Sequence, residues 1–280
     1  MAAALSCAAK GIAAQLVAIP SGGWPIHAPV EHHPPVSLDD VLARMRRAHD
    51  SLEPPSGHLR YFLATYARTT QAVGAAVEAA RFEDPEWVVH WDVVFADLYL
   101  DALDLYRKNP ETAPRPWRLA FGAEPGLPPL RHVLLGINAH VNYDLPQALL
   151  GVISDADFTD PLVLARRKRD HERIDRVLAS RVGAEDDELV RASGGRALVD
   201  RLLSPLNRLG SKRFLRESRE KVWHNTTQLQ LARLAGSQAY ADRLAELELL
   251  SAARIADLLA PGQVLLRLAV AGFGVLLPPP

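Results

Sequence analysis

Apolar residues recur three and four positions apart along most of the chain, which is the spacing of one buried face of an α-helix. Ser37 is followed by two acidic residues and then by apolar positions, the pattern of a helix N-cap with acids in the first turn. Further helices are expected to begin near 59 and 86. Since alternating runs of β-branched residues are few, the pattern predicts an all-α fold.

The segment 130–150 is apolar on most of its circumference and predicts a central buried helix. A charged helix is expected at 162–181, followed by two more at about 185–209 and 211–259, with a break near Gly236. These segments predict one helical bundle of about seven to nine helices.

The two ends of the chain differ from this pattern. Residues 1–36 are rich in small residues, Pro, Gly and His, and predict a flexible extension before a helical domain at 37–260. Residues 261–280 form an apolar tail, shorter than the ~20 apolar residues of a membrane-spanning helix. The start lacks the basic region of an export signal and carries Lys10, so we expect a cytoplasmic protein without a transmembrane segment.

Composition narrows the possible functions. The 32 Lys and Arg residues balance 33 Asp and Glu residues, whereas a protein that neutralises many phosphates is basic, so nucleic-acid binding is disfavoured. Cys7 is the only cysteine, which excludes a disulfide within the chain and a Cys-based zinc site. Any metal must therefore be bound by His, Asp or Glu. The sequence leaves the oligomeric state open.

Four polar residues interrupt the apolar segment 130–150. A buried polar group without a partner costs about 1–3 kcal/mol, so these side chains must pair with one another or bind a ligand. His140 and Asp144 are four positions apart and therefore neighbours on one helical face, close enough to share a hydrogen bond or a divalent ion. Asn138 and Asn142 are candidates to hydrogen-bond the metal ligands or to contact a cofactor or substrate.

The same spacing recurs in His171 and Asp175. Two His-x-x-x-Asp pairs on consecutive helices could converge on a four-ligand site for zinc, manganese or iron that activates a bound water. His224 could line the same site opposite His140, although core packing by its neighbour Trp223 is the interpretation that we favour.

Other interpretations stay open. His140 and Asp144 could form a structural hydrogen-bonded pair, with His171 on the solvated face of a charged helix, or they could line a metal-free ligand pocket. The triplet His90-Trp91-Asp92 could supply a further ligand, but we favour a helix-start His and Asp flanking a packed Trp.

Several segments together resemble the actinobacterial family known as domain of unknown function 5995. They are Phe62-Leu63-Ala64-Thr65-Tyr66 with Thr69 and Thr70, Phe95 with Tyr99, Ala102 and Leu103, Trp117, and Leu135 to Pro146 with its Asn-Ala-His-x-Asn-x-Asp-Leu-Pro core. The resemblance spans roughly residues 37 to 255. It implies a helical fold and a bacterial source, and it implies no activity.

A looser similarity links the chain to the helical zinc-dependent phospholipase C and P1 nuclease group. His140, Asp144, Leu145 and Pro146 alone carry it, because the ligand motif of that group also contains His-x-x-x-Asp beside Leu and Pro. The similarity implies ligand roles for the His and the Asp, but it does not extend to a trinuclear zinc site.

The sequence therefore supports three hypotheses, two of which involve a small-molecule substrate. The first is a metal-assisted enzyme, most plausibly a hydrolase, in which the two His-x-x-x-Asp pairs bind one ion. The second is a metal-free cyclase, isomerase or lyase of secondary metabolism with His140 as general base, oriented by Asp144. The third is a non-enzymatic helical binding or scaffold protein.

Overall fold

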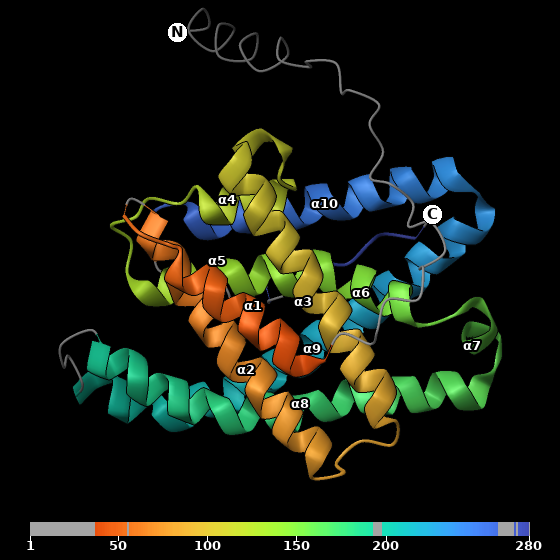
Figure 1. The fold of residues 1–280 in the computed structure, drawn as a ribbon, viewed down its shortest axis with the longest axis horizontal. Coiled ribbons are helices and arrows are strands. Elements are labelled where there is room, and N and C mark those ends of the chain that lie inside the picture. The colour runs from red at the N-terminus through yellow and green to blue at the C-terminus, as the bar shows by residue number, and fades with distance from the viewer. Residues whose placement is uncertain (1–36, 55, 193–197, 263–271, 273, 280) are drawn as a thin grey trace, which may run out of the picture. The chain divides into compact units, whose positions relative to one another are not determined.

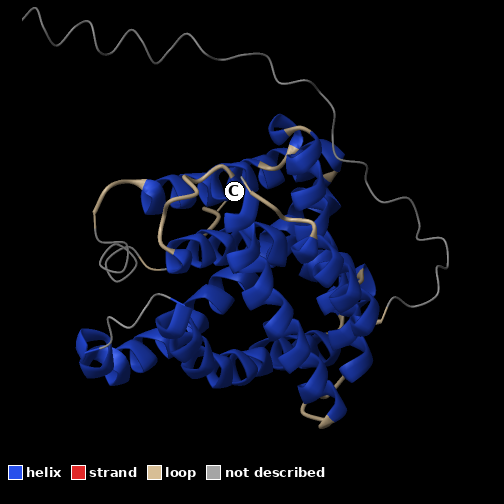
Figure 2. Ribbon diagram, turned by 60° about the vertical axis from the view of Figure 1, so that its left-hand side comes forward, coloured by secondary structure: helices blue, strands red, loops and turns tan. Residues whose placement is uncertain are grey.

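In the computed structural model, all the regular elements of the described residues are helices (Figure 1). The description covers residues 37–54, 56–192, 198–262, 272 and 274–279, with the side chains at 175 and 178–216 outside it. The predicted extension 1–36 therefore lies outside the described residues. The all-α prediction is confirmed, and Figure 2 shows helices and loops but no strand in the described part of the chain.

The elements follow one another in a simple order. They are α1 (Leu38–Asp50), η1 (Ser56–Leu59), α2 (Arg60–Glu78), α3 (Pro85–Lys108), η2 (Pro110–Thr112), α4 (Arg115–Phe121), α5 (Pro129–Ala139), η3 (His140–Asp144), α6 (Leu145–Val152), α7 (Asp155–Thr159), α8 (Pro161–Ala192), α9 (Leu198–Ala235) and α10 (Ser237–Leu259).

Local signals explain where the first long helices begin. The hydroxyl of Ser37 accepts the backbone N–H of Asp40, whose carboxylate accepts the N–H of Ser37, which makes a capping box at the start of α1. At the start of α3, the Asp84 carboxylate caps the N–H of Trp87, and Pro85 occupies the first turn, where its missing N–H is not needed.

The later helix boundaries differ from the prediction. α8 continues to Ala192, and α9 passes through Gly210, where the sequence had suggested an end. A single Gly inside a helix costs only about 1 kcal/mol relative to Ala, so it does not end a helix that is supported on both sides. The predicted break near Gly236 is confirmed: Gly236 has a φ of 127°, which favours glycine, and separates α9 from α10.

The predicted central helix is the axis of the bundle. It runs from Pro129 to Val152 as three consecutive elements, α5, η3 and α6, with η3 as a π-helical turn in the middle. Helices α2, α4 and α10 pack against α5, whereas α3 and α9 pack against α6. Residues of η3 are therefore surrounded by other helices.

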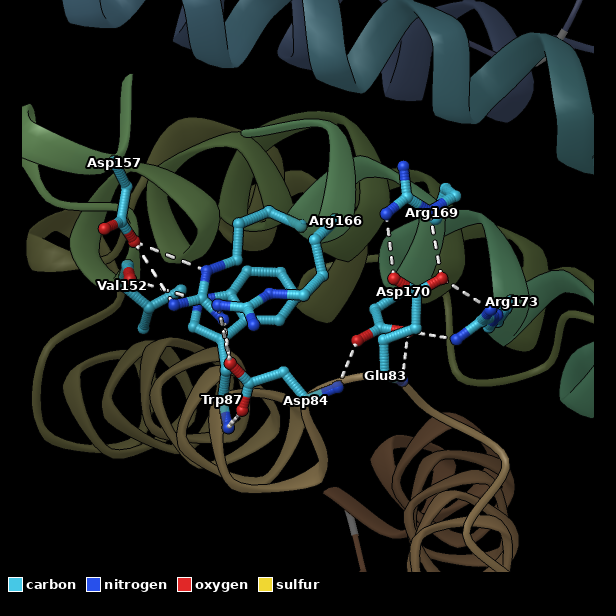
Figure 3. Close-up of polar contacts among 10 residues, drawn as sticks. Glu83, Asp84, Trp87, Val152, Asp157, Arg166, Arg169, Asp170 and Arg173 are labelled. Atoms are coloured by element: carbon cyan, nitrogen blue, oxygen red, sulfur yellow. Dashed lines mark hydrogen bonds and ion pairs between the residues drawn. The ribbon is translucent and has the colours of Figure 1, made fainter. Parts of the chain in front are cut away.

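Helix α8 is attached to the turn between α2 and α3 by charged side chains (Figure 3). The Asp170 carboxylate is fully buried and accepts the backbone N–H groups of Glu83 and Asp84, each at 2.8 Å. Arg173 donates to the same carboxylate at 2.9 Å. Arg167 reaches Asp84 from α8 as well, so the start of α3 is fixed by two residues of α8.

This arrangement shows that the alternative with His171 on the solvated face of the charged helix is wrong. Asp170 and His171 are 0% and 1% exposed, although Arg169 and Glu172 beside them are exposed. Their burial follows the helical period. Ile174, which is also buried, comes four positions after Asp170 and three after His171 and so lies on the same face. The charged run therefore contributes residues both to the exposed face of α8 and to its buried face.

Part of the predicted apolar tail packs on the bundle. Residues 274–279, here called the C-terminal strap, run without helical structure, and Val275 and Leu277 are buried. Residues 263–271, 273 and 280 lie outside the described residues. None of the helices described in the structure has the length and hydropathy needed to cross a membrane.

We predict that Asp170→Asn lowers the free energy of unfolding by about 3 kcal/mol, because an amide cannot accept both backbone N–H groups and leaves Arg173 without its anion. Urea unfolding at neutral pH measures this change. Glu172→Gln, at the exposed neighbouring position, is the control and should stay within about 0.5 kcal/mol of the wild type. A similar small change in Asp170→Asn would contradict the role of this carboxylate.

Candidate functional site

The π-helical turn η3 carries His140 and Asp144, the residues best suited to catalysis or ligand binding. The backbone N–H of Leu145 bonds to the carbonyl of His140, five residues earlier, instead of the four of an α-helix. Such turns occur mostly as single insertions in α-helices and are frequent at functional sites. Every residue of η3 except Val141 is buried.

His140 and Asp144 form the hydrogen-bonded pair that their spacing predicted. The distance from His140 Nδ1 to Asp144 Oδ2 is 2.8 Å, and the two side chains are 4% and 3% exposed. Trp117, from α4, donates its indole N–H to the same carboxylate oxygen at 2.8 Å. The carboxylate is therefore fixed between a donor from α4 and the imidazole.

Burial sets the protonation of this pair. It lowers the pKa of His140 well below its usual value and raises the pKa of Asp144 well above its usual value, a rise that the hydrogen bond from Trp117 partly opposes. His140 is therefore neutral at pH 7. Because Oδ2 of Asp144 faces both the indole N–H of Trp117 and Nδ1 of His140, we assign the imidazole proton to Nδ1, where this oxygen accepts it, which leaves a lone pair on Nε2.

Nε2 of His140 is buried and has no hydrogen-bond partner among the described residues. The ring lies in an aromatic box. Phe95 stacks on it at 3.6 Å between centroids with an interplanar angle of 4°, and Tyr66 meets it edge-on at 4.5 Å. The other walls, at 5.8–5.9 Å, are Phe62, Tyr99 and Trp117. Such surroundings strengthen electrostatic interactions because they exclude water.

Gly136 allows α5 to approach α2 closely enough to form the box. A Cβ at this position would lie 2.3 Å from Cγ of Phe62, so no other residue fits without moving that ring. Phe62 and Gly136 also line a small pocket of about 10 Å³, together with His58 and His132. This volume is that of about one water molecule.

The pairing of α2 with α3 places further polar groups beside the box. The ring centroids of Phe62 and Tyr99 are 5.2 Å apart, and those of Tyr66 and Phe95 are 5.9 Å apart. The two helices are therefore antiparallel, and each step of four residues toward the end of α2 pairs with a step of four residues toward the start of α3. If this pairing is continued by four residues, we infer that Thr70 lies toward Trp91 and Asp92 of α3. The resulting polar row consists of Tyr66 Oη, Thr70 Oγ1, Trp91 Nε1 and Asp92 Oδ2, all buried and without a hydrogen-bond partner among the described residues.

Electrostatics supports the closeness of Tyr66 and Asp92. Burial raises the pKa of Asp92 to about 7, and the pKa of Tyr66 is raised by burial and next by the charge of Asp92. Each partnerless buried polar atom costs about 1–3 kcal/mol, so a row of them is expensive unless a water or a ligand binds there. The polar row and His140 Nε2 together define the candidate site.

His171, the histidine of the predicted second pair, does not contact His140. The ring centroid of His171 lies 5.4 Å from that of Trp91 and 5.6 Å from that of Trp223. Among the described residues, its ring packs against none of the aromatic residues that surround His140. Its Nε2 also lacks a partner among the described residues, and burial lowers its pKa. The side chain of Asp175 lies outside the described residues. Trp91, at one end of the polar row, is thus the contact between His171 and the candidate site.

The metal site stays a prediction. Within the part of the chain that the structure describes, no three His, Cys, Asp or Glu side chains are grouped as metal ligands. Asp144 bonds to Nδ1 of His140, on the opposite edge of the ring from the lone pair of Nε2. In this arrangement the two side chains cannot chelate one ion through Nε2.

The residues predicted to contact a cofactor bond to the chain itself. Asn138 donates to the carbonyl of Leu134 at 2.9 Å, and Asn142 donates to Asn138 Oδ1 at 3.3 Å. His224 Nε2 lies 3.1 Å from the carbonyl oxygen of Leu277 in the strap. A cofactor role for Asn138, Asn142 and His224 stays a prediction.

Sequence reasoning missed the contributions of Tyr66, Thr70 and Trp117. No local spacing relates them to His140, because they lie on α2 and α4. The sequence allows Asp92 as an extra ligand but favours a helix-start residue beside a packed Trp. In the structure Asp92 is 8% exposed and has the raised pKa of a buried acid. A signal was present in Tyr66 and Thr70, which are four apart on an otherwise apolar face.

Comparison with known protein families identifies the chain. The model described as "Family of unknown function (DUF5995)" matches residues 38–261. The chain belongs to this family. The matched range contains the whole candidate site of this DUF5995 protein, from Tyr66 to His140. Neither the curated proteins nor the solved structures with which the chain was compared gave a match.

The raised pKa of Asp92 predicts a pH-dependent stability. The carboxyl has a pKa of about 7 when folded and 3.8 when unfolded, so between these values the folded state binds more protons and its stability falls as pH rises. Asp92→Asn lacks this titration. Its stability relative to the wild type should therefore increase from about pH 4 to about pH 7, by at most about 4 kcal/mol.

Chemical unfolding at several pH values measures this difference. Asp104→Asn, at an exposed position of the same helix, controls for the removal of a carboxylate from α3. A difference between Asp92→Asn and the wild type that does not change with pH would show that Asp92 is not a buried acid.

Proposed function

We propose that this DUF5995 protein is an enzyme that moves a proton on a small molecule, with His140 as the general base. The observation that carries the proposal is the asymmetry of the imidazole: Nδ1 is bonded to Asp144, whereas Nε2 is buried without a partner. A neutral imidazole that is oriented by a carboxylate is the common form of a general base.

The neighbouring residues would orient the base and supply an acid. Asp144 orients the ring and stabilises the imidazolium that forms when Nε2 takes a proton, and Trp117 in turn orients Asp144. Asp92, whose pKa is about 7, is partly protonated at neutral pH and can donate a proton or a hydrogen bond to charge that develops on the substrate. A base and an acid in one site suit an isomerase or a lyase.

The walls indicate the kind of substrate. Phe62, Phe95 and Tyr66 supply apolar surface, whereas the polar row supplies a few hydrogen-bonding groups. Binding sites for small organic molecules combine these two features. We therefore expect a mainly apolar molecule with one or two polar groups, and opening of the box when it binds.

The other two hypotheses remain as alternatives. A carboxylate behind a histidine is also common where the other ring nitrogen binds a metal, which favours the metal-assisted hydrolase, with Nε2 of His140 as one ligand. The scaffold hypothesis interprets His140, Asp144 and Trp117 as a packing network. The three hypotheses differ in what they predict for turnover and for chelation.

The test compares the wild type with His140→Gln. Each purified protein is incubated with a small-molecule extract of the cells that produce it, and mass spectrometry follows which compounds are converted. We expect the wild type to convert at least one compound and His140→Gln to be about 10²- to 10⁴-fold slower, the usual contribution of a general base. Melting curves establish that the variant is folded.

His90→Gln, at an exposed histidine of α3, is the matched control and should keep full activity. Turnover that survives His140→Gln would contradict the proposal, and so would a wild type that converts nothing, which favours the scaffold. Loss of wild-type turnover on chelation, with recovery on adding zinc, manganese or iron, would replace the proposal by the metal-assisted alternative.

A further inference from the structure

The C-terminal strap binds to the bundle as an extended peptide. Val275 and Leu277 are 8% and 0% exposed, whereas Leu276 between them is 51% exposed, which is the alternation of an extended chain. The two buried residues belong to one apolar cluster with Tyr143 of η3. Its other buried members are Leu150, Leu229 and Leu247.

Side chains of α9 pair with the backbone of the strap. The amide of Asn225 donates to the carbonyl of Val275 at 3.0 Å and accepts the N–H of Leu277 at 2.9 Å, so one side chain makes both hydrogen bonds of a β-bridge. His224 lies next to the carbonyl of Leu277. Because Asn225 is buried, these bonds are shielded from water.

The strap also bonds to the turn that carries the candidate site. The N–H of Val275 donates to Asn142 Oδ1 at 3.2 Å, and Tyr143 packs against the strap. Asn142 and Tyr143 lie between His140 and Asp144 in η3. The π-helical turn is thus held by the strap through its middle residues and by the aromatic box through its two end residues.

We propose that the strap is a positioning element of the site and that Asn142 is the positioning residue through which it acts. A π-helical turn contains one residue more than an α-helical turn and is rare because its hydrogen bonds are less favourable. External contacts must therefore maintain it. Without the bond from Val275, η3 relaxes toward an α-helical turn, which rotates His140 relative to Asp144 and Trp117. The catalytic meaning of this inference rests on the proposed function.

The test uses three full-length variants. Asn142→Ala removes the acceptor in η3. Asn225→Ala, on α9, releases the strap without changing η3. Thr227→Ala, which removes a hydroxyl that bonds within α9, is the matched control. NMR follows the proton on Nδ1 of His140 and its exchange with water, a signal that reports the bond to Asp144 and needs no substrate.

Both asparagine variants are expected to shift this signal and to speed its exchange roughly fivefold, which corresponds to the loss of one hydrogen bond. Thr227→Ala should leave it unchanged. A signal that responds to Asn142→Ala alone, or to neither asparagine variant, would overturn the proposal.

Val275→Pro replaces Asn142→Ala if that variant does not fold, since it removes the same hydrogen bond from the side of the strap. The signal does not depend on turnover. Failure of this proposal is therefore distinguishable from failure of the proposed enzyme activity.

Discussion

Burying an imidazole and a carboxylate side by side constrains the rest of this structure. Each group loses its hydration, so a charge on either one is costly unless hydrogen bonds stabilise it, and each needs a partner with good geometry. His140 and Asp144 partner each other, and Trp117 supplies the second bond to the carboxylate. The remaining nitrogen has no partner in the described chain. A purely structural pair gains nothing from an unpartnered Nε2, whereas a general base or a ligand-binding imidazole needs a free nitrogen.

The packing around the pair follows from this constraint. Gly136 lets α2 approach until Phe62 closes one wall, and the antiparallel pairing of α2 with α3 provides Tyr66 and Phe95 as others. Thr70 of α2 and Asp92 of α3 each carry a buried polar atom without a partner among the described residues. Helix α8 fixes the start of α3 through Asp170, and the strap holds the other side of η3. Distant segments thus determine the geometry of one five-residue turn.

Much of the fold and the central pair could be predicted from the sequence. The 3.6-residue period identified an all-α bundle and a buried central helix, and the i, i+4 spacing predicted the contact between His140 and Asp144. The partners of the pair could not be predicted, because Trp117 and Tyr66 reach it by tertiary packing. A π-helical turn leaves no simple mark in the sequence. The burial of Asp170 and His171 was missed because charged neighbours on the outer face of α8 masked the inner face.

The central claim is that His140 carries a lone pair on Nε2 within a closed aromatic box. The most direct measurement is the ¹⁵N chemical shift of its two ring nitrogens at neutral pH, in the wild-type protein with ¹⁵N-labelled histidine. Our account predicts a neutral ring with a protonated Nδ1 and an unprotonated Nε2. A protonated Nε2, with or without a proton on Nδ1, would contradict it.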